Sequence, residues 1–399
     1  MKKKILIVSD SLNMGGLEKC LLNVCDNLDY SKYHVDLYLF NEGRTLLEKL
    51  NKNVNLLPDS PYYKDVYNTS IMQSVKTLIK KKKPFFAFYR IVRFLRARMK
   101  DYAYRNSDWR VMQKTMLKID NKYDIAIGFA EGTASYYVAD CVNADVKIGC
   151  FHTDLKRISH NWELDEKTFK SMNKVVTVSS NSLKSLQEIH PDCKEKFVCI
   201  HLPALMDYDE MNRLSLERNC MDDEKAVKII SVGRLVELKG FHLCVEPCRK
   251  LVDDGFNVKW YIAGEGEYRQ TIESLVKKHN LENNFILLGN CQNPYTYIRS
   301  ADICVQPSSY EGFSLSVIEG KHFKKPMVVS DIPSNKEMIK DGFNGFVVKR
   351  DENEIYTAVK KLVADAELRQ RLGKEPTIAE TDNRAIMQSF ENLFEGEQL

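Results

Sequence analysis

Residues 302–320 decide the fold, and they read DICVQPSSYEGFSLSVIEG. The apolar run from Ile303 to Val305 predicts a buried strand, and apolar residues at helical spacing from Leu315 onward predict a helix. A short loop joins the two. The backbone N–H groups of Gly312 to Leu315 therefore lie at a helix N-terminus, where unpaired amides and a partial positive charge favour a bound phosphate.

Two glutamates, Glu311 and Glu319, flank this loop and helix. On one helix their Cα atoms would be about 12 Å apart, on faces that diverge by about 80°. The paired carboxylates of a glycoside hydrolase stand about 5 to 9.5 Å apart across one bond. We therefore expect Glu311 and Glu319 to bind hydroxyls at opposite ends of one elongated ligand, with a diphosphate between them: a nucleotide-sugar.

Length and composition indicate a globular protein of two domains. The chain has 399 residues, of which 44% are apolar and 29% charged, and this length suits two α/β domains of about 200 residues each. Lysine and arginine exceed aspartate and glutamate by 59 − 55 = 4. So small an excess gives no reason to expect nucleic acid as a partner.

The eleven cysteines are scattered, and no Cys-x-x-Cys pair occurs. This pattern favours reduced, buried thiols in a cytosolic protein over disulfides or a zinc site. Nowhere do 18 apolar residues follow one another, so we expect no membrane-spanning helix.

The first half of the chain repeats a strand and helix pattern that predicts a mostly parallel sheet. The loop at Gly15 and Gly16 follows the first strand, and such loops either face a ligand at the carboxyl end of the sheet or simply turn the chain. His152 also follows a strand, although a lone histidine is more often a loop residue with a satisfied hydrogen bond. The predicted strands are 4–9, 34–40, 54–57, 123–129, 146–151, 175–179 and 197–200.

The segment 76–100 breaks this rhythm. It holds ten Lys or Arg and no Asp or Glu, interleaved with aromatic and aliphatic residues. Such a segment suits the surface of an anionic membrane, where each cation contributes about 1 kcal/mol. It equally suits a helix that buries its aromatic face on the first domain, and both alternatives stay open. No nucleic-acid-binding motif accompanies the charge.

Residues 203–224 lose apolar periodicity and predict an interdomain linker. They contain Asp207-Tyr208-Asp209, nominally a metal-binding Asp-x-Asp, which in a polar linker is more typical of a solvated turn. The strand predicted at 227–232 is followed by Arg234 and Lys239. These two cations can meet a diphosphate from two directions, one as a planar fork and one as a point charge. Further strands are predicted at 258–263, 284–288, 303–305 and 327–330, with helices from Glu354 onward and a break at 373–376.

Together these motifs resemble the family 4 glycosyltransferases, whose GT-B fold has two facing Rossmann-like doubly wound domains, α/β in class, with an interdomain cleft. The resemblance implies an acceptor-binding domain at 1–204, a nucleotide-sugar-binding domain at 205–376, and a C-terminal helix within 377–399 that crosses back to the first domain. The motifs are Ser231-Val232-Gly233-Arg234-Leu235 with Lys239-Gly240, Pro307-Ser308 with Tyr310-Glu311-Gly312-Phe313, the pair Glu311 and Glu319, and Pro326-Met327-Val328-Val329 through Asn344-Gly345-Phe346.

The resemblance implies a retaining transfer that needs no metal and no cofactor besides the donor. Arg234 and Lys239 would neutralise the leaving diphosphate, Glu311 would bind sugar hydroxyls, Glu319 the ribose, and His152 would lie against the donor sugar. The implied catalytic residues are His152, Arg234, Lys239 and Glu311, and the implied donor-binding residues are Gly15, Gly16, Arg234, Lys239, Glu311, Gly312, Phe313, Ser314, Leu315 and Glu319.

The sequence departs from the family pattern beside the predicted site. Ser314 stands where glycine is common, Gly320-Lys321-His322 follow the second glutamate where small or apolar residues are usual, and Lys324-Lys325 precede Pro326. The first change bears on the amide geometry at the phosphate. The other changes bear on helix packing.

The expected function is transfer of a sugar, with UDP as the commonest carrier in the family, to a glycan or lipid-linked acceptor in surface polysaccharide biosynthesis. We expect a cytoplasmic protein at the inner face of the membrane, with peripheral contact through 76–100 and no nucleic acid partner. The alternatives are a nucleotide-sugar epimerase on the same fold and a partner subunit without turnover.

Overall fold

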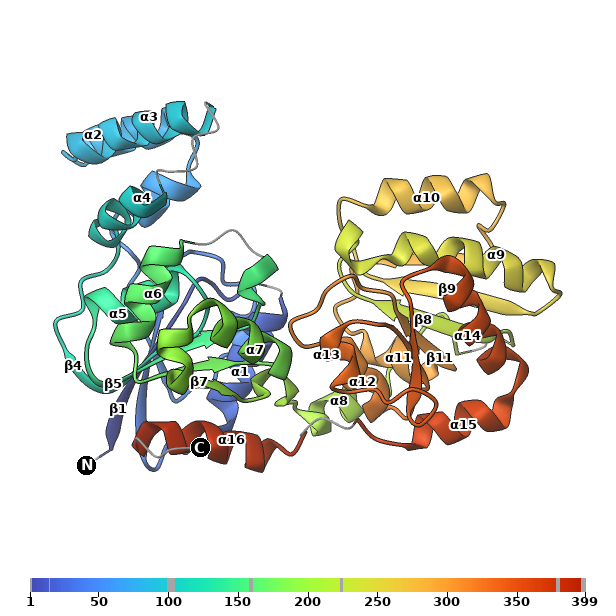
Figure 1. Ribbon diagram of the computed structural model, residues 1–399. Coiled ribbons are helices and arrows are strands. Elements are labelled where there is room, and N and C mark those ends of the chain that lie inside the picture. Colours follow the sequence, from blue (N-terminus) through green and yellow to red (C-terminus); the bar gives the residue numbers. More distant parts are fainter. Residues whose placement is uncertain are drawn as a thin grey trace. The chain divides into compact units, whose positions relative to one another are not determined.

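The computed structural model describes residues 2–13, 15–98, 105–157, 161–222, 225–377 and 381–395. By contacts, the chain divides into two compact units, which Figure 1 shows as two separate sheets with their helices. Unit 1 comprises Met1–Val178, Ser182–Pro203 and Asn383–Leu399, and unit 2 comprises Ser179–Asn181 and Ala204–Asp382.

Unit 1 is built on a seven-stranded sheet in which every neighbouring pair is parallel. Ile5 to Val8 of the central strand are fully buried, because helices cover both faces of a parallel sheet. All seven predicted strands of this unit are present. In hydrogen-bonded order they are β3 (Val54–Leu56), β2 (Tyr33–Leu39), β1 (Lys3–Ser9), β4 (Lys122–Gly128), β5 (Asn143–Phe151), β6 (Lys174–Thr177) and β7 (Phe197–Cys199).

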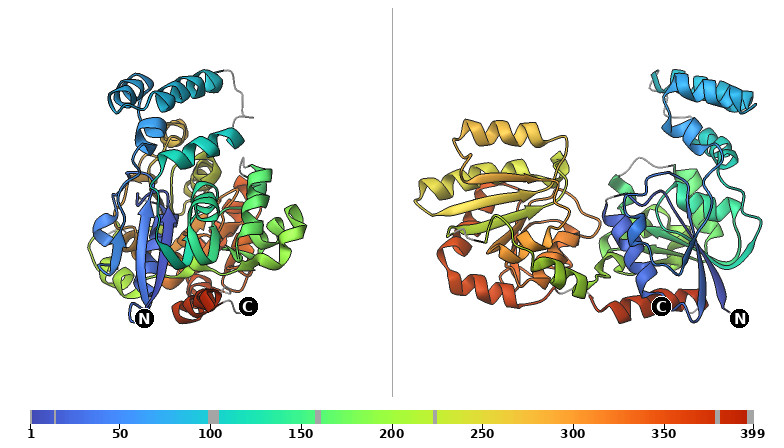
Figure 2. Two further views of the ribbon diagram at one scale, coloured as in Figure 1. Left: turned by 90° about the vertical axis from the view of Figure 1, so that its left-hand side faces the viewer. Right: turned by 180° about the vertical axis from the view of Figure 1, so that it is seen from behind.

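The helices of unit 1 include one from the end of the chain. The C-terminal helix α16 (Asn383–Asn392) lies beside α1 (Gly16–Asn27), as Figure 2 shows. The ring of Phe394 meets that of Tyr33 edge to face at 5.7 Å, and Lys3 pairs with Glu395 at 2.6 Å. The remaining helices are α2 (Ile71–Lys80), α3 (Pro84–Arg98), α4 (Arg105–Met112), α5 (Thr133–Cys141), α6 (Trp162–Ser171) and α7 (Ser180–Ile189).

The basic segment predicted at 76–100 forms the end of α2 and most of α3, and its residues 99 and 100 lie outside the described residues. These helices pack on the short π-helix η2 (Lys64–Asn68) through a small apolar cluster of their own. Its buried members are Val66, Leu78, Phe86 and Ala87. Part of the aromatic face is therefore buried, as one of the two sequence alternatives required.

Unit 2 has a six-stranded parallel sheet around an apolar core that includes Trp260 and Phe241. The sequence predicted five of its strands and missed β13, which pairs with β12 at the edge. In hydrogen-bonded order the strands are β10 (Phe285–Gly289), β9 (Val258–Ala263), β8 (Val227–Val232), β11 (Ile303–Gln306), β12 (Met327–Ser330) and β13 (Gly345–Val348).

The helices of unit 2 depart from the sequence prediction in the expected linker. The expected linker 203–224 contains α8 (Tyr208–Ser215), and the Asp207 carboxylate accepts a hydrogen bond from the Glu210 N–H at 2.8 Å. Asp207-Tyr208-Asp209 is therefore a capped helix start rather than a solvated turn. α15 (Ala366–Lys374) ends within the break expected at 373–376, and residues 375–377 are not helical, so this expectation is confirmed to within two residues. The other helices are α9 (Val245–Asp253), α10 (Arg269–Lys278), α11 (Tyr295–Ser300), α12 (Leu315–His322), α13 (Pro333–Lys336), α14 (Glu352–Ala364) and α15 (Ala366–Lys374).

The structure also bears on the expectations for the cysteines and for membrane-spanning helices. All eleven cysteines are free thiols, as the sequence predicted. Among the described residues, no helix combines the length and the apolar character that crossing a bilayer would take.

Candidate active site

The candidate site of unit 2 lies where the order of its strands changes direction. β8 pairs with β9 on one side and with β11 on the other, and ligands of doubly wound sheets bind at the carboxyl ends of the strands beside such a point. The loops that follow β8, β11 and β12 leave the sheet at this edge. Sequence analysis placed Arg234 and Lys239 on the first loop and Glu311 on the second.

The loop after β8 is pressed against the loop after β11. Gly240 has φ 71°, a left-handed conformation that side chains other than glycine rarely adopt. A Cβ on Gly240 would lie 2.3 Å from the carbonyl oxygen of Pro307. The Ser309 N–H also donates to the Leu238 carbonyl at 2.8 Å. Glycine is therefore needed at 240 both for its backbone conformation and for this close approach.

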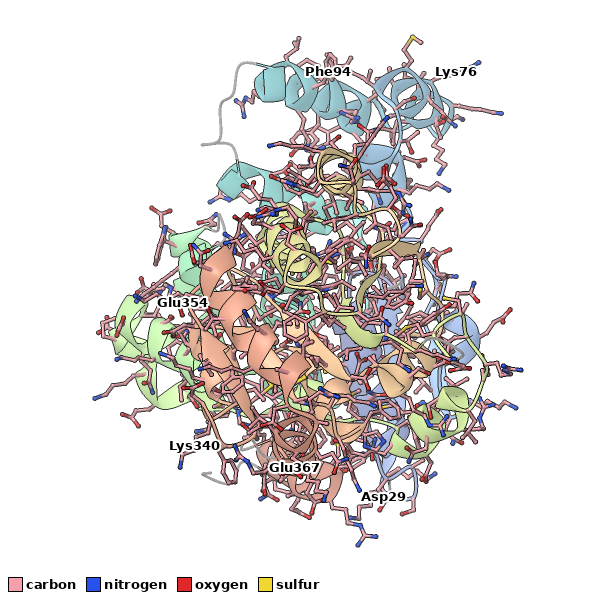
Figure 3. The ribbon with its side chains drawn as sticks, turned by 90° about the vertical axis from the view of Figure 1, so that its right-hand side faces the viewer. Asp29, Lys76, Phe94, Lys340, Glu354 and Glu367 are labelled. Carbon is pink, nitrogen blue, oxygen red and sulfur yellow. The ribbon has the colours of Figure 1, made fainter. Side chains whose placement is uncertain are left out.

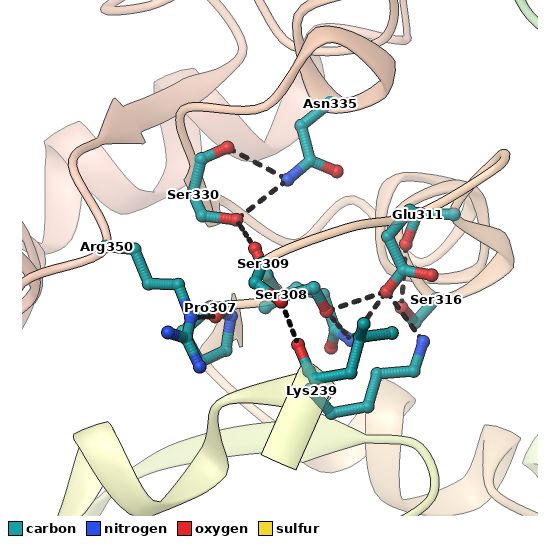
Figure 4. A network of polar contacts seen from close by, with 12 residues as sticks. Lys239, Pro307, Ser308, Ser309, Glu311, Ser316, Ser330, Asn335 and Arg350 are labelled. Carbon is teal, nitrogen blue, oxygen red and sulfur yellow. Dashed lines mark hydrogen bonds and ion pairs between the residues drawn. The ribbon is translucent and has the colours of Figure 1, made fainter. Parts of the chain in front are cut away.

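At this junction Lys239 and Glu311 form an ion pair (Figure 4). Lys239 Nζ lies 2.6 Å from Glu311 Oε1, and the side chains are only 18% and 11% exposed. Ser308 Oγ donates to the same oxygen at 2.7 Å, and Gln306 Nε2 contacts it at 3.4 Å. Glu311 Oε2 forms no hydrogen bond with a described residue, so it can accept one from a ligand hydroxyl.

Further hydrogen bonds hold the loop after β11 in place, and the residues that donate them were not singled out from the sequence. Arg350, just after β13, donates through Nε to the Pro307 carbonyl at 3.2 Å and through Nη2 to the Glu237 carbonyl at 3.1 Å. Ser330 Oγ bonds the Ser308 carbonyl, and Asn335 Nδ2 bonds the Ser330 carbonyl at 2.9 Å. The loop that carries Glu311 is thus fixed by groups from three strand ends.

Arg234 lies on the same loop as Lys239 and is exposed. Within the part of the chain that the structure describes, its guanidinium forms no ion pair or side-chain hydrogen bond. The structure therefore does not join Arg234 to the Lys239–Glu311 pair. Its donors remain available to an anion at the edge of the site.

The helix predicted after the loop is α12, which begins at Leu315 with Ser314 as its N-cap residue. The Ser314 side chain does not cap the helix and instead contacts the Ser316 hydroxyl at 3.1 Å. Val317 N–H already bonds the Ser314 carbonyl. The N–H groups of Leu315 and Ser316 have no backbone acceptor among the described residues, as expected of the first turn of a helix that can hold a phosphate.

Glu319 lies on α12 and is only 3% exposed. It stands beside Tyr295 of α11, whose pKa is raised first by burial and then by the charge of Glu319. The two predicted glutamates thus differ in setting. Glu311 faces a lysine at the strand ends, and Glu319 is enclosed within the helix layer.

In unit 1 the candidate residues follow β1, β4 and β5, which are adjacent in the sheet. Gly15 is the N-cap residue of α1, and Gly16 is its first residue. The backbone N–H of His152 donates to Glu131 Oε2 at 3.0 Å. Glu131 follows β4 and was missed from the sequence, where only its position after a predicted strand could have indicated it.

The His152 ring packs 5.1 Å from the ring of Phe129, and its Nε2 atom is buried with no hydrogen-bond partner. Burial lowers the pKa of His152, and the nearby Glu131 carboxylate opposes this shift. A buried ring nitrogen without a partner is costly unless a ligand satisfies it. No three His, Cys, Asp or Glu side chains gather to hold a metal ion in the described ranges.

The match to a known protein family falls within unit 2. Residues 218–377 match the family described as glycosyl transferases group 1. The poly(ribitol-phosphate) alpha-N-acetylglucosaminyltransferase of Staphylococcus aureus is 29% identical over 168 residues, 41% of this chain and 34% of that protein. The N-acetylgalactosamine-N,N'-diacetylbacillosaminyl-diphospho-undecaprenol 4-alpha-N-acetylgalactosaminyltransferase of Campylobacter jejuni is 31% identical over 174 residues, 43% of this chain and 46% of that protein. The match therefore spans less than half the length of either relative.

The fold extends the likeness over the whole chain. The crystal structure of Anabaena Alr3699/HepE in complex with UDP and glucose superimposes with a TM-score of 0.73 at 16% identity, covering 99% of this chain and 100% of that one. Two Rossmann-like units with parallel sheets define the class, the GT-B fold. The match to glycosyl transferases group 1 covers residues 218–377, less than half of the chain. The predicted fold and the predicted resemblance to glycosyltransferases are both confirmed.

Proposed function

We propose that this protein is a retaining glycosyltransferase that moves a sugar from a UDP-sugar to a glycan or lipid-linked acceptor in surface polysaccharide biosynthesis. The observation that carries the proposal is the Lys239–Glu311 pair at the strand ends of unit 2. It places a cation and a carboxylate within one hydrogen bond of each other, beside helix amides that have no backbone acceptor. A ligand in which a phosphate adjoins a hydroxyl-rich ring needs the same groups, because the cation and the amides bind the phosphate and the carboxylate binds the hydroxyls.

In this proposal the donor separates the pair. The diphosphate takes the Lys239 ammonium together with Arg234, because two negative phosphates offer more charge than one carboxylate. The amides of Gly312 to Leu315 bind the same diphosphate, and Glu319 binds the ribose. Glu311, released from Lys239, then accepts hydrogen bonds from hydroxyls of the sugar.

The reaction breaks the bond between the sugar C1 and the diphosphate oxygen, and that oxygen keeps the electron pair. The acceptor hydroxyl forms the new bond to C1, and its proton passes to the departing UDP. Negative charge grows on the diphosphate in the transition state, where fixed cations and amides stabilise it. Both relatives named above carry "alpha" in their names, and an alpha-linked product from an alpha-linked donor means retention. No metal takes part in this scheme.

In unit 1 we assign His152 to the transferred sugar, as the family resemblance implies. Its unpartnered Nε2 supports the assignment, because a sugar hydroxyl would satisfy that nitrogen. The names of the two relatives point to poly(ribitol-phosphate) in one and a diphospho-undecaprenol-linked sugar in the other. We therefore place the reaction at the inner face of a membrane that carries the acceptor.

The test is a donor screen followed by a transfer assay. Thermal unfolding in UDP, GDP or ADP identifies the base, and we expect UDP to raise the midpoint temperature most. The corresponding UDP-sugars are then incubated with and without lipid-linked acceptors, and products are separated by mass. Release of free epimeric sugar in the absence of acceptor would replace transfer with epimerisation, and no turnover under any condition would favour an inactive partner subunit.

A further inference from the structure

The two helices α2 and α3 and their connection, residues 71–98, form what we call the docking hairpin. Figure 3 shows Lys76 on α2 and Phe94 on α3, on two helices that lie side by side. Ten large apolar side chains are exposed among the described residues, and six of them belong to this hairpin. Those six are Met72, Ile79, Phe85, Phe88, Ile91 and Leu95.

On each of the two helices these side chains fall on one side. At 100° per residue, positions 85, 88, 91 and 95 of α3 fall within an arc of about 120°, and positions 72 and 79 of α2 fall within about 20°. Phe86 and Ala87 point the other way and pack with Leu78 on Val66 of η2. The inner face of the hairpin is therefore filled, while the apolar outer face is open to solvent, and large exposed apolar patches on soluble proteins mark interaction sites.

The cations divide in the same way. The hairpin has nine Lys or Arg and no Asp or Glu. Three cations face inward with partners: Lys81 meets Asp65 at 2.6 Å, Arg93 meets Asp108 at 3.6 Å, and Arg90 donates to the Thr69 carbonyl at 3.1 Å. Other cations are exposed and form no ion pair within the described ranges, namely Lys76, Lys80, Lys82 and Arg96.

The turn between α2 and α3 has a lysine at a position where glycine would adopt the backbone conformation with less strain. Lys82 has φ 55°, the left-handed conformation that glycine usually supplies after a helix. The Lys82 N–H bonds the Ile79 carbonyl at 2.9 Å and the Lys83 N–H bonds the Leu78 carbonyl at 2.8 Å. A lysine here accepts backbone strain that glycine would avoid, and it places a cation in the turn between α2 and α3.

We propose that the outer face of the docking hairpin binds the surface of an anionic lipid bilayer. Phe85, Phe88 and Leu95 enter the boundary between headgroups and acyl chains, and the exposed lysines meet the anionic headgroups. A second copy of this chain fits the face poorly, because it would bring the same positive charge against it. The role that we give to docking, access to a lipid-linked acceptor in the membrane, rests on the proposed function. The binding of the hairpin to the bilayer does not rest on it.

The experiment sediments the full chain with vesicles of phosphatidylglycerol and phosphatidylcholine, or of phosphatidylcholine alone. We expect at least about tenfold tighter binding to the anionic vesicles, because several cations act together. The triple substitution Lys76→Gln, Lys80→Gln and Lys82→Gln should weaken that binding at least about tenfold. Phe88→Ser should weaken it as well and should act in high salt too.

A matched control is available in unit 2. Leu216 is 68% exposed, like Phe88 at 67%, so Leu216→Ser removes the same kind of surface outside the hairpin and should leave vesicle binding unchanged. Circular dichroism and UDP binding check that each variant is folded. Vesicle binding with no transferase activity would leave docking standing and defeat the proposed function alone.

Three results would overturn the docking proposal. One is equal or absent binding to the two kinds of vesicle. Another is wild-type binding by both the triple lysine variant and Phe88→Ser. The third is concentration-dependent dimerisation in light scattering that Phe88→Ser abolishes, which would assign the face to a second copy instead.

Discussion

The two units present their strand ends differently. In unit 2, Lys239 and Glu311 bond each other, Ser308 also bonds Glu311, and Arg350 holds the loop that carries Glu311. In unit 1, the buried Nε2 of His152 has no partner, and the one hydrogen bond of Glu131 among the described residues is to the His152 backbone N–H. The family match also separates the two units, because it covers residues 218–377 of unit 2 and none of the residues before them. Under the proposed function, unit 2 supplies the donor chemistry within the region of the family match, and unit 1 supplies the residues that distinguish one transferase from another.

The largest expected effect falls on the Lys239–Glu311 pair. Lys239→Ala should lower kcat/KM at least about a hundredfold, about 2.7 kcal/mol of transition-state stabilisation, because the leaving diphosphate loses its point charge. Glu311→Ala should cost a similar factor, and the double variant should lose less than the sum of the two, as expected of residues in contact. Steady-state kinetics with the best UDP-sugar measures all three.

Lys277→Ala serves as the control, because it removes an exposed lysine on α10. Its rate should equal that of the wild type. Near-normal rates for Lys239→Ala and Glu311→Ala would contradict the role given to this pair, and with it the contrast drawn between the two units.

The next effect concerns the frame of unit 2. Lys321 on α12 is buried and donates to the carbonyls of Leu372 at 2.6 Å, Asn344 at 3.0 Å and Gly373 at 3.3 Å. Lys321→Met should lower the free energy of unfolding by about 2 to 3 kcal/mol, because it leaves buried carbonyls without a donor. Urea denaturation measures this loss, and an unchanged midpoint would contradict it.

The same residue predicts a pH dependence. Burial lowers the pKa of Lys321 to about 8, whereas an exposed lysine titrates near 10.4. Between these values the unfolded chain binds more protons than the folded one, so this contribution to stability rises with pH. The difference in unfolding free energy between wild type and Lys321→Met should therefore grow from pH 8 to pH 10, and a constant difference would refute the assignment.

A smaller effect is expected where two loops of the candidate site in unit 2 touch. Gly240→Ala should cost about 2 kcal/mol of stability from its left-handed backbone and its overlap with the Pro307 carbonyl, and it should weaken UDP binding by moving the loop of Lys239. Gly255→Ala is the matched control, since Gly255 has φ 84° with no atom within 4 Å of its added Cβ. It should share the backbone strain and leave UDP affinity unchanged. Equal affinity losses in both variants would count against the contact.

The smallest effect concerns unit 1. Glu131→Gln removes the charge that opposes the lowering of the His152 pKa, so the pKa of His152 should fall further. NMR titration of the ring protons measures the shift, with Glu195→Gln as an exposed control. We expect about a tenfold loss of kcat/KM, in keeping with one positioning residue. An unchanged pKa in Glu131→Gln would show that the two groups do not interact.

Sequence patterns located most of the candidate site of unit 2 and fewer of the candidate residues of unit 1. Strand and helix periodicity located the loops after β8 and β11 and the start of α12, because local spacing determines these elements. It could not show that Lys239 and Glu311 bond each other, since 72 residues separate them and only the order of strands brings them together. Arg350 was missed for the same reason, as it follows β13, the one strand of unit 2 that the sequence analysis left out.

The central claim, that the strand ends of unit 2 hold the diphosphate of the donor, is tested most directly by calorimetric titration with UDP and with uridine. We predict that UDP binds and that uridine, which lacks phosphates, binds far more weakly. Arg234→Ala and Lys239→Ala should each weaken UDP binding and leave uridine binding unchanged. UDP affinity equal to the wild type in both variants would contradict the account.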